Sequence, residues 1–377
     1  MTKTPTQKFA YVDALRGYAV FGVILMHATG IASASSGLHS LSVAGMYGVQ
    51  LFYLMSAFTL FYSFHSRHDE PHPISSFFIR RFFRIAPLFY VAIAFYSFYR
   101  LPEWSSPVSL KNVLYEGTFI EGVLLSKAGG IVPGGRTVAL EFAFYSVLPF
   151  LATIITNLRR AIFFFFISIS IAIGSQILAG ELGVPAHAIE RYHWFPDQVP
   201  VFALGIILYF LIFDQKKRNP LPWTAAAAVM FCALGALALK RPSILTGALV
   251  QPMRHVVVSI GLLCFAWLLA VRRPKWALNS LIRSYGINSF SAYICHWCVI
   301  NLAAGIFFAR IPITKNFGVF LPIVLILTYC LANVTRYLIE DPFIRLGKHL
   351  TRSMSLKAQR PSALELAAEK ASISGEL

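Results

Sequence analysis

Residues 11–31 have the sequence YVDALRGYAVFGVILMHATGI, an apolar run long enough to cross a lipid bilayer, since a membrane-spanning helix needs about 20 mainly apolar residues. Similar runs recur along the chain. Lipid satisfies no backbone hydrogen-bonding groups, so such runs must be helical. The sequence therefore predicts an all-α, polytopic integral membrane bundle of about ten transmembrane helices. The expected spans are 11–31, 47–64, 85–100, 141–157, 161–179, 198–213, 222–239, 255–271, 287–306 and 316–338.

Composition supports the same class. The 377 residues are 57% hydrophobic and 13% charged, whereas soluble domains carry about a quarter charged residues; this excludes a soluble enzyme, a disordered chain and a collagen-like chain. The net charge of +17 fits a nucleic-acid-binding protein, but cytoplasmic loops of membrane proteins also collect Lys and Arg. With a cytoplasmic N-terminus, 23 of the 33 basic residues lie on the cytoplasmic side. Both termini are therefore predicted to be cytoplasmic, and a nucleic-acid partner is unnecessary.

The chain shows no sign of a second folded domain. We expect one transmembrane domain over residues 1–350 and a polar, flexible cytoplasmic tail over residues 351–377. The connection at about 101–140 is punctuated by Pro and Gly, which predicts an extracytoplasmic loop with a short surface helix. The five cysteines lie in or beside apolar runs. Cys295 and Cys298 have CxxC spacing, but no second pair completes a metal site, so we expect no metal.

Three ionisable residues interrupt the first span, namely Asp13, Arg16 and His27. Ionisable groups inside a membrane are costly and mark functional sites. Arg16 and His27 are 11 residues apart, which places them on one helix face about 16 Å apart along the axis, and Asp13 lies one turn before Arg16. The alternative is that Arg16 extends to the headgroups and His27 forms a hydrogen bond between helices.

Arg80, Arg81 and Arg84 stand at the cytoplasmic start of the third span. Such a cluster can simply anchor a helix on the cytoplasmic side. Arg81 and Arg84 share a helix face, however, and paired guanidinium groups suit phosphate. They are candidates for binding a phosphorylated ligand from the cytoplasm.

Glu141 opens the fourth span on the non-cytoplasmic side, and Tyr145 follows one turn later. That side is also the expected side of His27. A carboxylate that orients an imidazole supports a general base, although a Glu in water at the interface is the alternative. His296 is a second intramembrane histidine; alone it would be assigned to core packing.

Six segments, in this order, resemble the acyltransferase-3 superfamily of bacterial membrane O-acyltransferases. Each motif is weak alone, but six in register make chance similarity improbable. The second ends in Ser56-Ala57 where the family has Ser-Gly, and the fourth lacks the family's Trp-Ser, although Thr137 keeps a hydroxyl. The matching segments are 13–17 with His27, 48–57, 80–87, 136–145, 291–296 and 337–343.

The resemblance implies an acyl-coenzyme A donor, most often acetyl, and a carbohydrate acceptor. The expected reaction is transfer of the acyl group to a hydroxyl of a cell-surface glycan, such as an exopolysaccharide or O-antigen, outside the cytoplasmic membrane of a bacterium. The roles expected for the site residues are donor phosphate binding by Arg80, Arg81 and Arg84, general base or transient acyl carrier for His27, polarisation of His27 by Glu141, positioning of Arg16 by Asp13, and secondary roles for Tyr145, His296 and Ser56.

A transporter or flippase that moves a glycan or lipid without modifying it is the rival hypothesis. It accounts for intramembrane charge equally well. It gives no reason for the spacing of Arg16 and His27 beside a cytoplasmic arginine pair.

Overall fold

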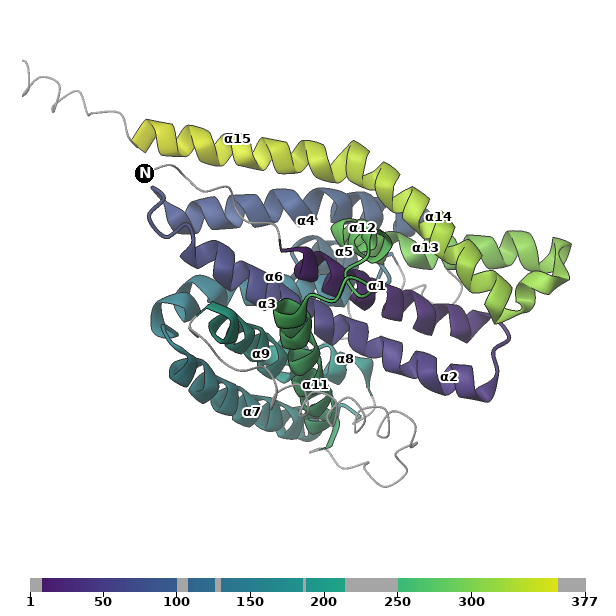
Figure 1. Ribbon diagram of the computed structural model, residues 1–377, viewed down its shortest axis with the longest axis horizontal. Coiled ribbons are helices and arrows are strands. Elements are labelled where there is room, and N and C mark those ends of the chain that lie inside the picture. Colours follow the sequence, from purple (N-terminus) through teal and green to yellow (C-terminus); the bar gives the residue numbers. More distant parts are fainter. Residues whose placement is uncertain (1–8, 100–107, 126–129, 186–187, 214–249, 359–377) are drawn as a thin grey trace, which may run out of the picture.

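The computed structural model describes residues 9–99, 108–125, 130–185, 188–213 and 250–358. These ranges form a bundle of helices without named strands (Figure 1), in which an isolated bridge pairs Ser33 with Asn316. In chain order the elements are α1 (Ala10–Ile31), α2 (Ser36–Val43), η1 (Ala44–Tyr47), α3 (Gly48–His65), α4 (Pro73–Phe98), α5 (Leu110–Gly117), η2 (Ile120–Gly122), α6 (Gly135–Ile154), α7 (Leu158–Glu181), α8 (Ile189–Tyr192), α9 (Phe195–Phe213), α11 (Val250–Arg272), α12 (Ser280–Ile287), α13 (Ser289–Arg310), η3 (Pro312–Lys315), α14 (Phe317–Thr335), η4 (Arg336–Glu340) and α15 (Asp341–Ala358).

Within the described ranges, eight helical segments are long and apolar enough to cross a membrane. This confirms the predicted all-α, multi-pass membrane protein. The predicted span at 85–100 coincides with α4, which is not among the eight, and that at 222–239 lies outside the described residues. The count of ten and the side of the termini stay predictions. The eight segments are Ala10–Ile31, Gly37–His65, Gly135–Ile154, Leu158–Glu181, Phe195–Phe213, Arg254–Arg272, Ser289–Arg310 and Phe317–Leu356.

Helices α1 and α3 occupy the middle of the bundle. Helix α1 packs against α12, α3 and α13, and α3 packs against α9 and α6. The crossing of α1 and α12 is close because two glycines meet a neighbouring backbone there: a Cβ at Gly17 would collide with the carbonyl of Ile282, and one at Gly286 with the carbonyl of Asp13. Small residues allow this approach between membrane helices, and here they fix the start of α1.

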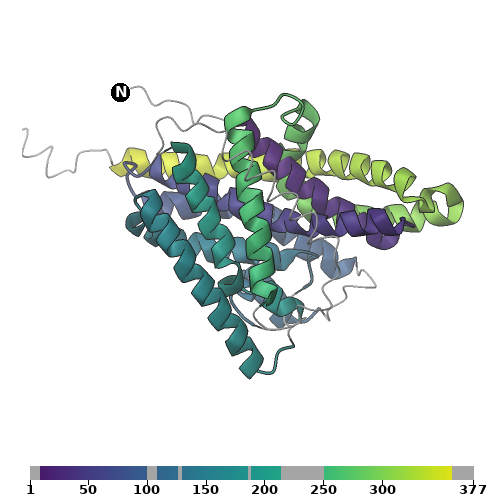
Figure 2. The ribbon, with the colours of Figure 1, turned by 60° about the horizontal axis from the view of Figure 1, so that its bottom comes forward.

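Helices α7 and α9 form a second group, packed side by side. Figure 2 shows this pair running at a steep angle to the nearly horizontal α15. Helix α11 packs against α9 and also reaches α1 and α3, so the two groups share a core. Its largest fully buried side chains include Tyr53, Phe89, Phe144 and Phe202.

The chain from Phe317 to Ala358 follows one helical path through α14, η4 and α15, and α15 lies along α4 (Figure 1). The first part of the predicted tail, residues 351–358, is helical and continues α15. Packing explains this: Gly347 lies against Phe83 of α4, and Thr351 is buried. Residues 359–377 lie outside the described residues. In the 101–140 connection, the expected short helix is α5.

Candidate functional site

Helix α6 presents three polar side chains on one face. It begins after Gly134, whose φ of 80° is a left-handed conformation that suits glycine, and a Cβ there would collide with Tyr293. Thr137, Glu141 and Tyr145 follow at intervals of four and so lie one above another. The Tyr145 hydroxyl donates to Glu141 Oε2 at 2.9 Å. The sequence around 137–145 thus delivers a carboxylate with a fixed partner.

Helix α1 brings Arg16 to the same place. Its Nη2 donates to Oγ1 of Thr59, on α3, at 3.0 Å. The negative charges of Asp13 and Glu141 both act on this guanidinium. Thr59 therefore holds Arg16 through a hydrogen bond, while Asp13 and Glu141 act on it through their charge; the positioning role expected for Asp13 stays a prediction.

Helix α4 divides the arginine cluster. Arg81 and Arg84 face inward, and Arg81 Nη2 lies 3.5 Å from Oγ of Ser63. Arg80 turns elsewhere: its Nη1 lies 2.8 Å from Oε2 of Glu70 in an ion pair. Of the three arginines expected at one site, the structure thus brings Arg81 and Arg84 together, because positions three apart share a helix face and Arg80 lies outside it; phosphate binding stays a prediction.

These side chains enclose a small space of about 60 Å³, which we call the arginine cavity. Three guanidinium groups and one carboxylate surround it, which leaves the wall with excess positive charge. Such donors stabilise an oxygen that becomes negative during a reaction. Its polar lining consists of Arg16, Ser56, Thr59, Arg81, Arg84, Thr137, Glu141, Tyr145, Ser289 and Tyr293.

A second space of about 430 Å³, the histidine cavity, lies beside the first. The His27 ring stacks on that of His296, with centroids 5.3 Å apart, and lies 4.4 Å from the ring of Trp297. No carboxylate of the described residues lines this cavity. The residues around it are Val23, Met26, His27, Met46, Val49, Gly134, Thr137, Ala188, Tyr192, His193, Tyr293, His296 and Trp297.

Two side chains, Thr137 and Tyr293, line both cavities. They form a shared wall between a cationic compartment and a neutral one. The Tyr293 hydroxyl also lies 3.4 Å from the carbonyl oxygen of Gly134, so the wall is tied to the start of α6. A group that passes this wall moves from the arginines to the histidines.

Comparison with known proteins identifies the chemistry. The family model described as an acyltransferase domain, Acyl_transf_3, matches residues 9–336. The chain belongs to this family. Among curated proteins it is similar to "Putative membrane-bound transacylase BcsY" of Komagataeibacter xylinus, with 25% identity over 361 residues, which cover 88% of this chain and 83% of that protein. No solved structure matches the chain.

In this acyltransferase the predicted site residues fall into two sets. The structure brings Arg16, Ser56, Arg81, Arg84, Glu141 and Tyr145 to the arginine cavity, and His27 and His296 to the histidine cavity. The expected pairing of Glu141 with His27 is not what the described residues show, because the two line different cavities. Helix α6 begins next to the histidine cavity, which Gly134 lines. Glu141 lies further along the helix, beyond Thr137 of the shared wall, and therefore lines the arginine cavity.

Two sequence motifs of the family meet in the fold. The hydroxyl of Ser291, in α13, hydrogen-bonds with the carboxylate of Glu340, at the end of η4. Arg336 of the same π-helical turn donates to the carbonyl oxygen of Ile287 at 2.8 Å. Segments 291–296 and 337–343 therefore form one junction, which fixes α13 and with it His296.

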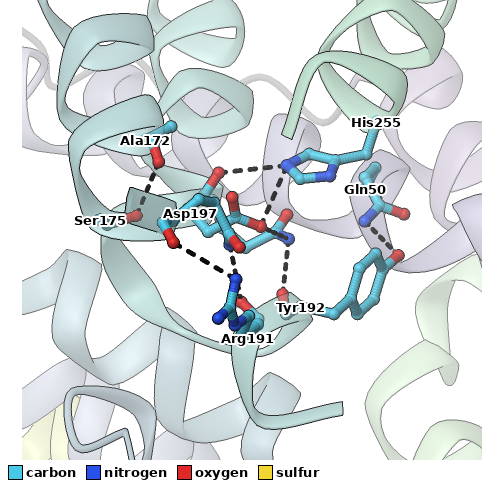
Figure 3. Close-up of polar contacts among 9 residues, drawn as sticks. Gln50, Ala172, Ser175, Arg191, Tyr192, Asp197 and His255 are labelled. Atoms are coloured by element: carbon cyan, nitrogen blue, oxygen red, sulfur yellow. Dashed lines mark hydrogen bonds and ion pairs between the residues drawn. The ribbon is translucent and has the colours of Figure 1, made fainter. Parts of the chain in front are cut away.

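The sequence analysis missed the wall that Tyr192 and His193 contribute to the histidine cavity. Figure 3 shows Tyr192 beside Gln50, whose Nε2 donates to the Tyr192 hydroxyl at 2.5 Å. Arg191 anchors the same turn through hydrogen bonds to the carbonyl oxygens of Gln176 and Val184. The available signal was the polar and aromatic run ERYHWFPD at 190–197 directly before a span.

Further polar contacts join the two helices that lie next to the Tyr192 turn. His255 Nε2 lies 3.4 Å from Asp197 Oδ2 and 3.1 Å from the Asp197 carbonyl oxygen (Figure 3). Both side chains are buried. A buried pair satisfied in this way fixes the geometry of its surroundings, so α9 and α11 hold the Tyr192 turn in place.

Metal binding finds no support among the residues described. No group of three or more His, Cys, Asp or Glu side chains in these ranges is placed to hold a metal ion. The CxxC pair lies in α13, with both cysteines buried. The expectation of a metal-free site stays a prediction.

Proposed function

We propose that this acyltransferase moves an acyl group, most often acetyl, from cytoplasmic acyl-coenzyme A to a hydroxyl of a glycan destined for the cell surface. The bacterial cytoplasmic membrane is the proposed location, with both termini inside. The observation that carries the proposal is the shared wall: among the described residues, Thr137 and Tyr293 face both the cationic cavity and the neutral one. Donor and acceptor chemistry would meet there.

The proposed donor site binds the phosphates of coenzyme A through positively charged side chains. Arg81 and Arg84 face the arginine cavity from the helix end that the charge pattern places in the cytoplasm, and guanidinium pairs bind phosphate through two parallel hydrogen bonds. The cavity is too small for the nucleotide of coenzyme A, so the nucleotide stays at the arginine pair and the thioester enters. Arg80 is left out of this site because it pairs with Glu70.

The thioester carbonyl requires stabilisation when it becomes tetrahedral. Arg16, held by Thr59, lines the arginine cavity, and the hydroxyls of Thr137 and Tyr293 line both cavities; these are the proposed donors. His27 follows beyond that wall, either as the base for the acceptor hydroxyl or as a transient carrier of the acyl group. Asp13 and Glu141 keep Arg16 oriented.

The test uses membranes from the host with the gene deleted, supplied with the wild-type protein or an empty vector, and acetyl-labelled acetyl-coenzyme A. Label in the surface glycan with the wild-type protein alone supports the proposal. Movement of glycan or lipid across the membrane without label in either supports the rival transporter. Mass spectrometry of the glycan then locates the acylated hydroxyl.

A further inference from the structure

The histidine cavity receives one histidine from each of three segments. His27 comes from α1, His296 from α13, and His193 from the turn between α8 and α9. Burial and the nearby charge of Arg136 lower the pKa of His193 to about 4, so this ring is neutral at physiological pH. A neutral cavity of this kind suits an uncharged ligand rich in hydroxyl groups.

The tautomer of His296 follows from its hydrogen bond. Nδ1 lies 2.6 Å from the carbonyl oxygen of Tyr293. A carbonyl oxygen only accepts, so Nδ1 carries the proton and Nε2 of the neutral ring presents a lone pair. Orientation of an imidazole through its Nδ1–H is what prepares the opposite nitrogen to act as a base. The backbone of α13 thus supplies to His296 the kind of orienting partner that the sequence analysis expected Glu141 to supply to His27.

The lone pair of His296 lacks a partner among the described residues. Nε2 is buried and has no hydrogen bond with them, and the residue is 1% exposed. An unsatisfied buried acceptor costs about 1–3 kcal/mol, which a hydroxyl donor bound there would recover. His193 Nδ1, at the same cavity, is likewise buried without a hydrogen bond. The two unpartnered nitrogens favour a ligand that donates hydrogen bonds at more than one point.

His27 differs from His296 in its surroundings. Its contacts are ring contacts, a stack on His296 and a tilted approach to Trp297, and it is only partly buried. A ring without a fixed hydrogen bond is free to present either nitrogen to a thioester coming past Thr137 and Tyr293. The two stacked histidines are therefore suited to different steps.

We propose that His296 is a further catalytic residue, whose Nε2 takes the proton from the acceptor hydroxyl while His27 carries the acyl group. This rests on the proposed function. In the first step a ring nitrogen of His27 bonds to the acyl carbon, the carbon–sulfur bond breaks, and the displaced His27 proton leaves with the thiol of coenzyme A. In the second step the acceptor oxygen bonds to the acyl carbon and the carbon–nitrogen bond breaks. The hydroxyl proton passes to His296 Nε2 and then to the freed nitrogen of His27.

The decisive variant is His296→Asn in the full-length protein. Asparagine keeps an N–H close to the position of Nδ1, which can still donate to the Tyr293 carbonyl, but it has no proton-accepting nitrogen. With acetyl-coenzyme A we expect one rapid equivalent of thiol per protein, label retained on the protein, and transfer into the glycan at least about 10²-fold slower than wild type. His27→Ala should release no rapid thiol. His349→Ala, an exposed histidine of α15, serves as the control and should match wild type.

A second variant guards against a purely structural effect. His296→Ala leaves room beside a cavity of about 430 Å³, so added imidazole should restore transfer of label into the glycan. Wild-type transfer by His296→Asn, absence of labelled protein in that variant, or rescue of His27→Ala in place of His296→Ala would overturn the inference. Failure of the wild-type protein itself to release thiol from acetyl-coenzyme A would instead refute the proposed function.

Discussion

The arginine cavity and the histidine cavity share a wall but differ in charge and size. The first has three guanidinium groups, one carboxylate and about 60 Å³ of space; the second has three histidines, aromatic rings and about 430 Å³. The first cavity suits a carbonyl oxygen that becomes negative, and the second suits a neutral acceptor. The difference shows how one bundle can separate activation of the donor from recognition of the acceptor.

The largest expected effect comes from Glu141→Gln, which tests whether Glu141 belongs to the arginine side alone. Glutamine is nearly isosteric and can still accept from Tyr145, but it removes the negative charge beside Arg16. Because a misplaced Arg16 no longer meets the thioester, we expect thiol release to slow about 10²-fold. Stopped-flow detection of free thiol across a pH series measures this.

The pH profile separates the two possible roles of Glu141. If the carboxylate acts only within the arginine cavity, the pH at half-maximal rate stays that of wild type. A shifted profile with a normal maximal rate would show that Glu141 acts through His27, and the division into two compartments would then be wrong.

A smaller effect is expected for Arg84→Lys, which keeps the charge and loses the planar pair of donors. The apparent KM for acyl-coenzyme A should rise about tenfold, with kcat nearly unchanged because Arg16 and the shared wall, which the proposal assigns to the thioester carbonyl, are unaltered. Arg80→Lys is the matched control, since Arg80 pairs with Glu70 outside the cavity and its KM should change less than about twofold. Equal KM values for the two variants would mean that these arginines only anchor the helix.

The smallest effect concerns the segment that supports the shared wall. Glu116 and Glu121 are buried next to one another outside the candidate spans, and the Glu116 carboxylate accepts hydrogen bonds from the backbone N–H groups of Ile131 and Val132. Desolvation raises the pKa of both carboxyls, and the negative charge of Glu121 raises the pKa of Glu116 further. This region ends at Gly134, which contacts Tyr293.

The folded state therefore binds these protons more tightly than the unfolded state. Stability must fall as pH rises above about 4.3, the ordinary range of a carboxyl, and the fall ends above the raised pKa values. Glu121→Gln should flatten this decline by a few degrees in Tm. The measurement is thermal unfolding of the wild-type protein and Glu121→Gln in detergent between pH 5 and pH 8. An equal decline of Tm with pH in the two proteins would contradict the prediction.

Local sequence was sufficient for the helices and for much of the arginine cavity. Apolar runs of about 20 residues can only be helical in lipid, which is why α1, α3 and α13 could be predicted. The spacing of Arg81 and Arg84, like that of Glu141 and Tyr145, places side chains on a shared helix face regardless of the neighbouring helices. The turn at Tyr192 and His193 escaped prediction because its role depends on contacts with Gln50 and α11, far away in the chain.

Which residues face each other across the bundle was decided by the tertiary structure. The sequence places Glu141 and His27 near the same side of the membrane, but Glu141 lies one turn beyond Thr137 of the shared wall and lines the arginine cavity, whereas His27 lines the histidine cavity. The sequence also indicates that His296 is a second intramembrane histidine. Only the tertiary structure shows that its Nδ1 bonds to the Tyr293 carbonyl oxygen, that its ring stacks on His27, and that its Nε2 has no partner among the described residues. Periodicity along a helix is a local property, whereas the direction in which a face points depends on partners distant in the chain.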